Sequence, residues 1–245
     1  MAKALKTRQE VDELLIGPVF DDLDELEGYR ATLRESGLFE QIWTAHEWFH
    51  KNVTDRTPRG YRPVLGGIPR GADARLYAVL RKLQPRAAVE TGVCSGHSTS
   101  FILQSLHDND AGKLTSIDWP EYMNTEPEED QFWEGKGGAV VPAGKESGWA
   151  IPDLLRDRWD LVIGKSQQEL PPLLDRLGGI DFFLHDGEHS YDCMTFEYEH
   201  AFEALREGGV LASDALNWNS SFDDFAARVS RPIHRLGGYV GVIFK

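Results

Sequence analysis

The chain has 245 residues, of which 41% are hydrophobic and 27% are charged. These are the proportions of a globular protein, and they exclude a disordered, collagen-like or coiled-coil chain. Lys and Arg number 26 and Asp and Glu number 40, so the net charge is −14. Because such a charge repels a phosphate backbone, we expect no nucleic-acid partner.

Two cysteines, Cys94 and Cys193, are too few for a disulfide framework in a chain of this size, which favours a reducing compartment. No apolar stretch approaches the roughly 18–20 residues that a membrane-spanning helix requires. The N-terminus runs directly into charged, helix-like sequence without the apolar segment of a signal peptide. We therefore expect a cytoplasmic protein with no membrane partner.

Residues 8–52 carry apolar side chains at helical spacing, which predicts helices there. A stretch rich in Pro, Gly and Arg from Thr57 to Gly71 breaks this periodicity and indicates a linker. We therefore divide the chain into an N-terminal helical segment with its linker, residues 1–71, and a main domain, residues 72–245. Three roles of the N-terminal segment remain open: a cap over a substrate pocket, a homodimer contact, and ordinary packing.

From Ala72 onward, short apolar strands alternate with helices. The predicted strands are 87–91, 114–118, 159–163, 180–185 and 210–213, followed by two strands separated by Gly237-Gly238, the last covering 239–244. This alternation indicates a parallel sheet covered by helices on both faces. The tight turn at Gly237-Gly238 makes the final pair an antiparallel hairpin. We predict an α/β fold: a three-layer sandwich around seven strands, mostly parallel.

The loop after the first strand is the first candidate ligand site, because ligands of open α/β sheets bind beyond the carboxyl ends of the strands. The run from Glu90 to Ser98 holds Gly92 and Gly96 around a turn, and the helix behind it offers free N–H groups. The spacing fits neither a dinucleotide-binding G-x-G-x-x-G nor a phosphate loop. An ordinary turn is the alternative, but a carboxylate at Glu90 repels phosphate and favours a cationic or hydroxylated ligand.

The next two strand ends carry polar side chains as well. Asp118 ends the second strand, where a carboxylate accepts the hydroxyls of a ribose in nucleotide-binding units. Its alternative is an ordinary cap or turn. Ser166 and Gln167 follow the third strand, where a hydroxyl and an amide can contact an adenine edge. The alternative for each is an ordinary loop residue without a ligand.

Polar or ionisable side chains cluster at the end of the fourth strand and directly after it, within residues 185–191. We interpret His185 as a satisfied histidine at the strand end, and Asp186 and His189 as functional. Asp214 ends the fifth strand and should lie beside Asp186, because the fourth and fifth strands are neighbours. Two carboxylates so placed either repel each other or share a hard cation such as Mg²⁺.

The run from Glu90 to Ser98, with Asp118, Asp186 and Asp214 at successive strand ends, resembles the class I S-adenosylmethionine-dependent methyltransferases. The resemblance covers about residues 72–245. Within that class the chain is most similar to the small O-methyltransferases of the catechol type and to bacterial methyltransferases that act on natural products. It implies a Rossmann-like methyltransferase fold and S-adenosylmethionine as cofactor.

The resemblance also implies roles for individual residues. Glu90, Gly92, Gly96 and Ser98 would hold the methionine part of the cofactor, Asp118 the ribose, and Ser166 and Gln167 the adenine. Asp186 and Asp214 would bind a divalent metal. His189 falls where the catechol enzymes place a catalytic lysine, and Ala215 stands where a metal-binding Asn or Asp is expected. Asn217 or water would then supply that ligand.

We predict O-methylation of a small-molecule hydroxyl, with His189 as the base. A histidine, with an ordinary pKa of about 6.5, removes a hydroxyl proton at neutral pH. Mg²⁺ or another divalent cation on Asp186 and Asp214 would lower the pKa of a coordinated hydroxyl. An NAD-linked oxidoreductase and a non-catalytic nucleoside-binding or interaction protein of the same fold are the alternatives.

The connection from residue 120 to 152 is long for such a fold and carries Tyr122, Trp133 and Trp149. Connections of this length are usually functional or disordered. The aromatic content predicts an ordered lid over the substrate, and structural packing is the alternative.

Overall fold

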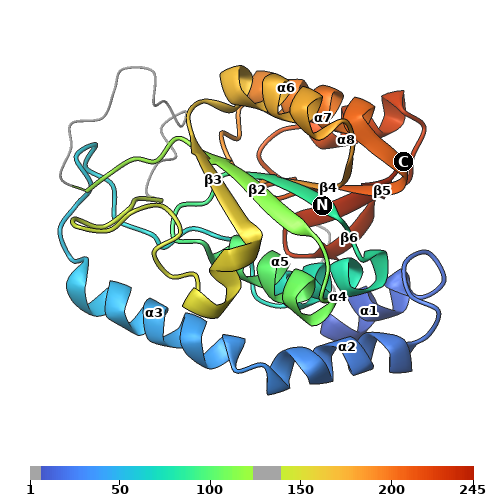
Figure 1. Cartoon of the computed structure of the whole chain (residues 1–245), viewed down its shortest axis with the longest axis horizontal. Helices are drawn as coiled ribbons and strands as arrows, with labels where there is room; N and C mark the ends of the chain where they lie inside the picture. The colour runs from blue at the N-terminus through green and yellow to red at the C-terminus, as the bar shows by residue number, and fades with distance from the viewer. Residues whose placement is uncertain (1–6, 124–138) are drawn as a thin grey trace.

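The computed structural model describes residues 7–123 and 139–245 (Figure 1). Their strands form one seven-stranded sheet in the order β3-β2-β1-β4-β5-β7-β6. The strands are β1 (Ala87–Thr91), β2 (Lys113–Asp118), β3 (Trp159–Ile163), β4 (Ile180–His185), β5 (Leu205–Ser213), β6 (His234–Gly237) and β7 (Val240–Phe244). Strands β1 to β5 pair in parallel, while β7 pairs antiparallel with both β5 and β6. The predicted seven-stranded, mostly parallel sheet with a closing hairpin is confirmed.

Helices cover both faces of the sheet, as predicted. They are α1 (Arg8–Leu15), α2 (Leu23–Glu35), α3 (Leu38–Asn52), α4 (Ala72–Leu83), α5 (His97–Asp108), α6 (Ser166–Leu177), α7 (Tyr191–Ala204) and α8 (Ser221–Arg228), with a 3₁₀ helix η1 (Asp153–Arg158) before β3. Helices α4 and α5 lie on one face, and α6, α7 and α8 lie on the other (Figure 1). None of the described helices is long and apolar enough to cross a bilayer.

One boundary differs from the sequence prediction. The sequence predicted a strand beginning at Val210, but α7 ends at Ala204 and β5 already begins at Leu205. Leu205 pairs with Ile180 of β4, and the register shifts before the pairing of Phe182 with Val210. Gly208 and Gly209 lie within this irregular part of β5, and Gly208 has a φ of +78°, a value that most residues avoid.

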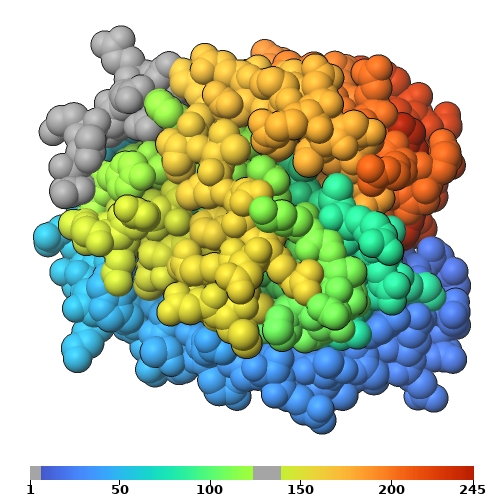
Figure 2. Space-filling view, viewed as in Figure 1, coloured from blue at the N-terminus to red at the C-terminus, as the bar shows by residue number. Residues whose placement is uncertain are grey.

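The N-terminal helices belong to the same hydrophobic cluster as the sheet. Leu15, Leu26 and Leu33 are fully buried and share this cluster with Leu76 and Leu80 of α4. In the space-filling view, the N-terminal helices form one flank of the molecule, in continuous contact with the rest (Figure 2). Burial of these leucines is worth about 1.5–3 kcal/mol for each side chain, so the flank is held mainly by apolar packing. The division at residue 71 stays a prediction.

A buried ion cluster joins this flank to the main domain. The Asp12 carboxylate accepts hydrogen bonds from Arg30 of α2 at 2.6 and 2.9 Å and from Nε of Arg75 in α4 at 2.6 Å. Arg75 also donates to the carbonyl oxygen of Leu236 in β6. Burial would raise the pKa of Asp12, but the two guanidinium groups outweigh it and hold this pKa below its ordinary value. Three separate elements therefore depend on one carboxylate.

Replacing Asp12 by alanine leaves two buried guanidinium groups without their shared carboxylate. We expect Asp12→Ala to lower the free energy of unfolding by about 3–5 kcal/mol, measured by urea denaturation. The matched control is the exposed neighbour Glu13, whose Glu13→Ala variant should stay within about 0.5 kcal/mol of the parent. Equal losses in the two variants would contradict the role of the cluster.

Candidate active site

The carboxyl ends of the parallel strands surround a cavity of about 230 Å³. Gly92, Asp118, Asp186, His189 and Asp214 line it. They come from the end of β2 and from the loops after β1, β4 and β5, which the sheet order places side by side. The structure therefore brings together five of the residues that the sequence singled out.

Gly92 is fixed by protein contacts at the end of β1. Its φ is +86°, and a Cβ atom there would lie 2.1 Å from the carbonyl oxygen of Asp186. The adjacent amide of Asp186 donates to the carbonyl of Thr91 at 2.8 Å. The β1 loop thus packs directly on the backbone after β4, which sets Asp186 at the cavity wall. Any side chain at position 92 would push the two loops apart.

Gly96 has a different neighbour. Its φ is +88°, and a Cβ atom there would lie 2.5 Å from Cγ1 of Ile151. Ile151 belongs to the connection between β2 and β3. Gly96 does not line the cavity. Its lack of a side chain allows Ile151 of that connection to pack against the loop.

Glu90 is fully buried and does not line the cavity. Its carboxylate accepts hydrogen bonds from the hydroxyls of Ser98 at 2.9 Å, Thr99 at 2.8 Å and Ser116 at 2.8 Å. Burial raises its pKa to about 7, although the three hydroxyls oppose the shift. Glu90 therefore holds the first turn of α5 against β1 and β2 from behind the loop.

Asp118 lines the cavity and also holds the β1 loop. Its carboxylate accepts hydrogen bonds from the amides of Val93 at 3.2 Å and Cys94 at 3.1 Å, and from the hydroxyl of Ser147 at 2.6 Å. Burial raises its pKa above the ordinary value. Asp118 thus lies at the meeting point of three loops.

Ser166 and Gln167 lie outside the cavity wall. The Ser166 hydroxyl lies 3.6 Å from Sγ of Cys193, and exposed Gln167 donates to Glu188 at 3.3 Å. Both residues begin α6, directly after the end of β3. The cavity reaches only as far as β2 in this direction, since Asp118 is the last strand-end residue on that side of its wall.

Asp186, His189 and Asp214 form a compact cluster. One ligand atom of each lies within 4.8 Å of the others. Oδ1 of Asp214 is buried without a hydrogen-bond partner in the described part of the chain. Burial raises the pKa of Asp214 to about 6, and burial, then the charges of Asp214 and Glu90, raise the pKa of Asp186 well above its ordinary value. A buried carboxylate oxygen without a donor fits a cation, and the two neighbouring carboxylates of Asp186 and Asp214 suit a hard divalent metal.

A buried carboxylate–histidine chain supports this cluster from behind. Oε2 of Glu197 lies 2.6 Å from Nδ1 of His185, and Nε2 of His185 lies 3.1 Å from Nδ1 of His189. Glu197 is fully buried in α7. Burial would raise its pKa, but His185 and the hydroxyls of Ser166 and Thr91 outweigh burial and lower it. Sequence reasoning missed Glu197, and its only signal was an acidic residue on the predicted core face of a helix.

Sequence reasoning also missed other residues of the cavity wall. The Trp218 ring packs edge-on against His189, with centroids 4.7 Å apart. Glu121 is 2% exposed, lines the cavity, and has its Oε2 3.4 Å from Nε of Arg59. Val64 and Gly66 come from the predicted linker, which therefore contributes to the site.

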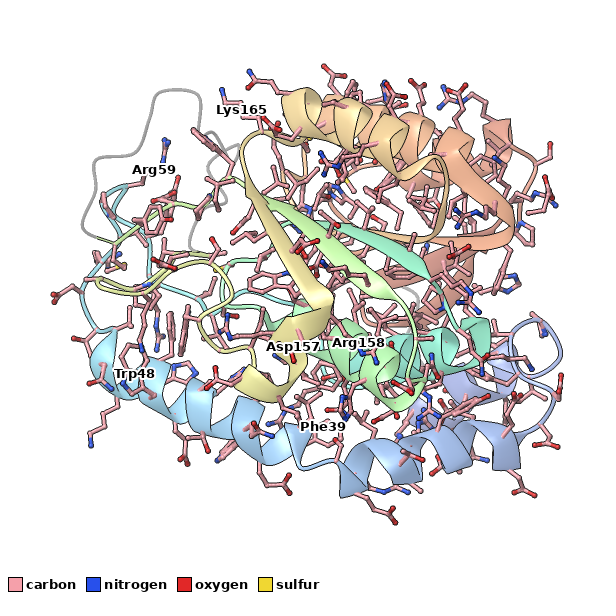
Figure 3. The ribbon with its side chains drawn as sticks, in the orientation of Figure 1. Phe39, Trp48, Arg59, Asp157, Arg158 and Lys165 are labelled. Carbon is pink, nitrogen blue, oxygen red and sulfur yellow. The ribbon has the colours of Figure 1, made fainter. Side chains whose placement is uncertain are left out.

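The connection predicted as a lid is described in part. Trp48 lies on α3 (Figure 3). The ring centroid of Trp149, in the connection, is 5.1 Å from that of Trp48, and Nζ of Lys145 is 4.7 Å from the centroid of the Trp48 ring. Tyr122 makes a β-bridge to Val141. Trp133 lies outside the described residues. The lid itself stays a prediction.

A family model described as a methyltransferase domain matches residues 89–215, which is more than half of the chain. The chain belongs to this methyltransferase domain family. It is an S-adenosylmethionine-dependent methyltransferase. A comparison with curated protein sequences finds no match.

Solved structures of methyltransferases share the fold. The S-adenosylhomocysteine-bound methyltransferase PaMTH1 of Podospora anserina is 15% identical, with a TM-score of 0.52 over 73% of this chain and 80% of that one. The calicheamicin methyltransferase CalS11 is 17% identical, with a TM-score of 0.51 over 71% of this chain and 77% of that one. At this identity the likeness establishes the Rossmann-like methyltransferase fold.

The buried carboxyl groups of this methyltransferase make its stability depend on pH. In the unfolded chain they titrate near 4, but the folded pKa values of Asp214 and Glu90 are about 6 and about 7. Between pH 5 and 7.5 the folded state holds more protons at these groups, so their contribution to stability falls as the pH rises. In the presence of a chelator, Asp214→Asn should reduce this loss of stability between pH 5.5 and 7.5 by about 0.8 kcal/mol, measured by urea denaturation at the two pH values. The exposed control Asp175→Asn should keep the parent's slope, and an unchanged slope in Asp214→Asn would contradict the prediction.

Proposed function

We propose that this methyltransferase methylates a hydroxyl group of a small molecule, and that His189 is the base. The observation that carries the proposal is the cluster of Asp186, His189 and Asp214 at the carboxyl edge of the sheet, with Glu197 and His185 behind it. Methyl transfer is an in-line displacement, so the protein must align the acceptor and take up its proton.

The cofactor is proposed to lie across the β1 loop. Gly92 and Asp118 line the cavity there, and the carboxyl groups of Asp118, Asp186 and Asp214 favour a cationic ligand. When bound, S-adenosylmethionine supplies an electrophilic methyl group on a positively charged sulfur. Asp118 is proposed to accept the ribose hydroxyls.

The other proposed cofactor residues act from outside the cavity wall. Glu90 holds Ser98, whose hydroxyl lies 3.4 Å from Oδ2 of Asp186, so the two residues set the loop that receives the methionine part. Gly96 allows the packing behind that loop. Ser166 and Gln167 reach the adenine only if it extends past Asp118 along the ends of β2 and β3, which pair up to Asp118 and Ile163.

The chain behind His189 sets its tautomer. Because the Glu197 carboxylate accepts the hydrogen of His185 Nδ1, Nε2 of neutral His185 is an acceptor. His189 is proposed to donate its Nδ1 hydrogen to that atom, so that Nε2 of His189 is the atom that takes the proton from the acceptor. Trp218 packs on the ring and restricts its rotation.

Metal assistance is the second part of the proposal. Asp186 and Asp214 would hold the cation, and the unpartnered Oδ1 of Asp214 supports this. Ala215 is buried, has a φ of +57° and offers no ligand atom, while Asn217 is exposed. When bound, a divalent cation lowers the pKa of a coordinated hydroxyl.

Titration calorimetry tests the cofactor site and separates the alternatives. We expect S-adenosylhomocysteine to bind and NAD not to bind. Asp118→Asn should lower the affinity for S-adenosylhomocysteine by about tenfold or more, because it removes a charged acceptor of hydrogen bonds. The control Asp175→Asn lies on the exposed surface of α6 and should bind like the parent. Binding of NAD alone would favour an oxidoreductase and contradict the proposal.

Replacing His189 separates a base from a metal ligand. With phenols and catechols as acceptors, His189→Ala should lower methyl transfer by about 100-fold or more. Its affinities for S-adenosylhomocysteine and for Mn²⁺, the latter measured by electron paramagnetic resonance, should stay close to those of the parent. The control His107→Ala alters an exposed histidine of α5 and should keep full activity.

Three outcomes would contradict this assignment. Full activity of His189→Ala would remove His189 from the mechanism. A parallel loss of Mn²⁺ affinity would make it a ligand in place of a base. Absence of transfer to every hydroxylated acceptor, in a protein that binds the cofactor, would overturn O-methylation.

A further inference from the structure

A second and larger cavity, of about 910 Å³, lies between the N-terminal helices and the starts of α4 and α5. Its wall includes side chains of α2 and α3 on one side and of α4 and α5 on the other. Gly66 and Gly67 line both this cavity and the active-site cavity, so this strip of backbone forms a shared wall. The volume is that of a site for a small organic ligand.

The wall of the second cavity is rich in cations, although the protein carries a net charge of −14. It contains Arg8, Arg30, Arg34 and Arg70, against two acidic residues, Glu40 and Asp73. Arg30 is bound to Asp12 and Glu27, and Arg34 lies 3.7 Å from Glu27, so in the described part of the chain the unpaired positive charge of this wall is mainly that of Arg70. Arg70 lies over the Trp43 ring, 5.2 Å from its centroid, and within the described residues no carboxylate lies within 4 Å of it. This local excess of positive charge favours an anion.

Two buried nitrogen atoms of the wall lack hydrogen-bond partners among the described residues, namely Nε2 of His97 and Nε of Arg30. The His97 side chain is only 8% exposed. Its nearest charged neighbour, Oδ2 of Asp73, is 3.6 Å from Nε2, which is too far for a hydrogen bond. Buried polar groups without partners are uncommon, and each one is an unused contact for a ligand.

The rest of the wall is apolar and aromatic. Phe39, at the start of α3, packs edge-on against Phe101 of α5 with ring centroids 5.7 Å apart (Figure 3). Trp43 lies one turn further along α3 and is 50% exposed. Flat aromatic surfaces beside guanidinium groups suit a ligand that is itself aromatic and carries an anionic substituent.

We propose that this cavity binds a small aromatic anion, such as an aryl carboxylate or sulfonate. The ring packs against Phe39 and Trp43, and the anionic group lies near Arg70 and His97. The site is distinct from that of the methyl acceptor, because the strip of Gly66 and Gly67 separates it from His189. It stands independently of the reaction proposed above.

Binding of a fluorescent aryl sulfonate to the whole protein tests the proposal. The probe is 1-anilinonaphthalene-8-sulfonate, and the matched neutral probe is N-phenyl-1-naphthylamine, which has the same rings without the sulfonate. Saturating S-adenosylhomocysteine is present to fill the active-site cavity. We expect saturable binding of the sulfonate, and binding of the neutral probe that is weaker by about tenfold.

Variants of exposed residues locate the bound probe. Arg70→Gln and Trp43→Ala should each lower the affinity for the sulfonate by about fivefold or more. The control is Arg231→Gln, which alters an exposed arginine after α8 and should leave this affinity unchanged. Circular dichroism and thermal unfolding verify that all three variants fold. The proposal is overturned if the sulfonate does not bind in the presence of S-adenosylhomocysteine, if the two probes bind equally, or if Arg70→Gln binds the sulfonate like the control.

Discussion

Four carboxyl groups, two of them buried and two partly buried, lie together where the parallel strands of this methyltransferase end. Glu90, Asp118, Asp186 and Asp214 all have raised pKa values, in each case mainly because burial disfavours the charged form. Hydroxyls and loop amides compensate Glu90 and Asp118, but Oδ1 of Asp214 has no such partner within the described residues. A cation bound at this edge would relieve a repulsion between carboxylates that the folded protein already contains. Part of the affinity for the proposed cation would therefore come from the assembly of the sheet.

The alternation of strands and helices was sufficient to predict most of this arrangement. Because β4 and β5 are adjacent, Asp186 and Asp214 were expected side by side, and the structure places both at one cavity. The direction of each side chain could not be predicted in the same way. Glu90 is buried with the rest of β1, and its carboxylate accepts hydrogen bonds from three hydroxyls behind the loop. Gly92 and Gly96 lack side chains because residues distant in the sequence pack against them.

His185 and Glu197 illustrate the same limit. The interpretation of His185 as a satisfied strand-end histidine agrees with its hydrogen bond to Glu197, but the sequence could not identify that partner. Glu197 lies in the middle of α7, and only the docking of this helix on the sheet brings its carboxylate to the end of β4. The spacing of apolar residues identifies an amphipathic helix and its buried face. The partner of one polar residue on that face depends on how the helix is rotated and shifted relative to the sheet.

The two cavities meet at a strip of chain without side chains. A Cβ atom on Gly67 would lie 2.6 Å from Cβ of His97, and one on Gly66 would lie 3.3 Å from Cβ of Cys94. His97 lines the second cavity, while Cys94 lines the active-site cavity. The strip is therefore held between one residue of each cavity at the start of α5. Because packed atoms leave little free space there, any side chain at position 67 would displace His97 from its place in the wall of the second cavity.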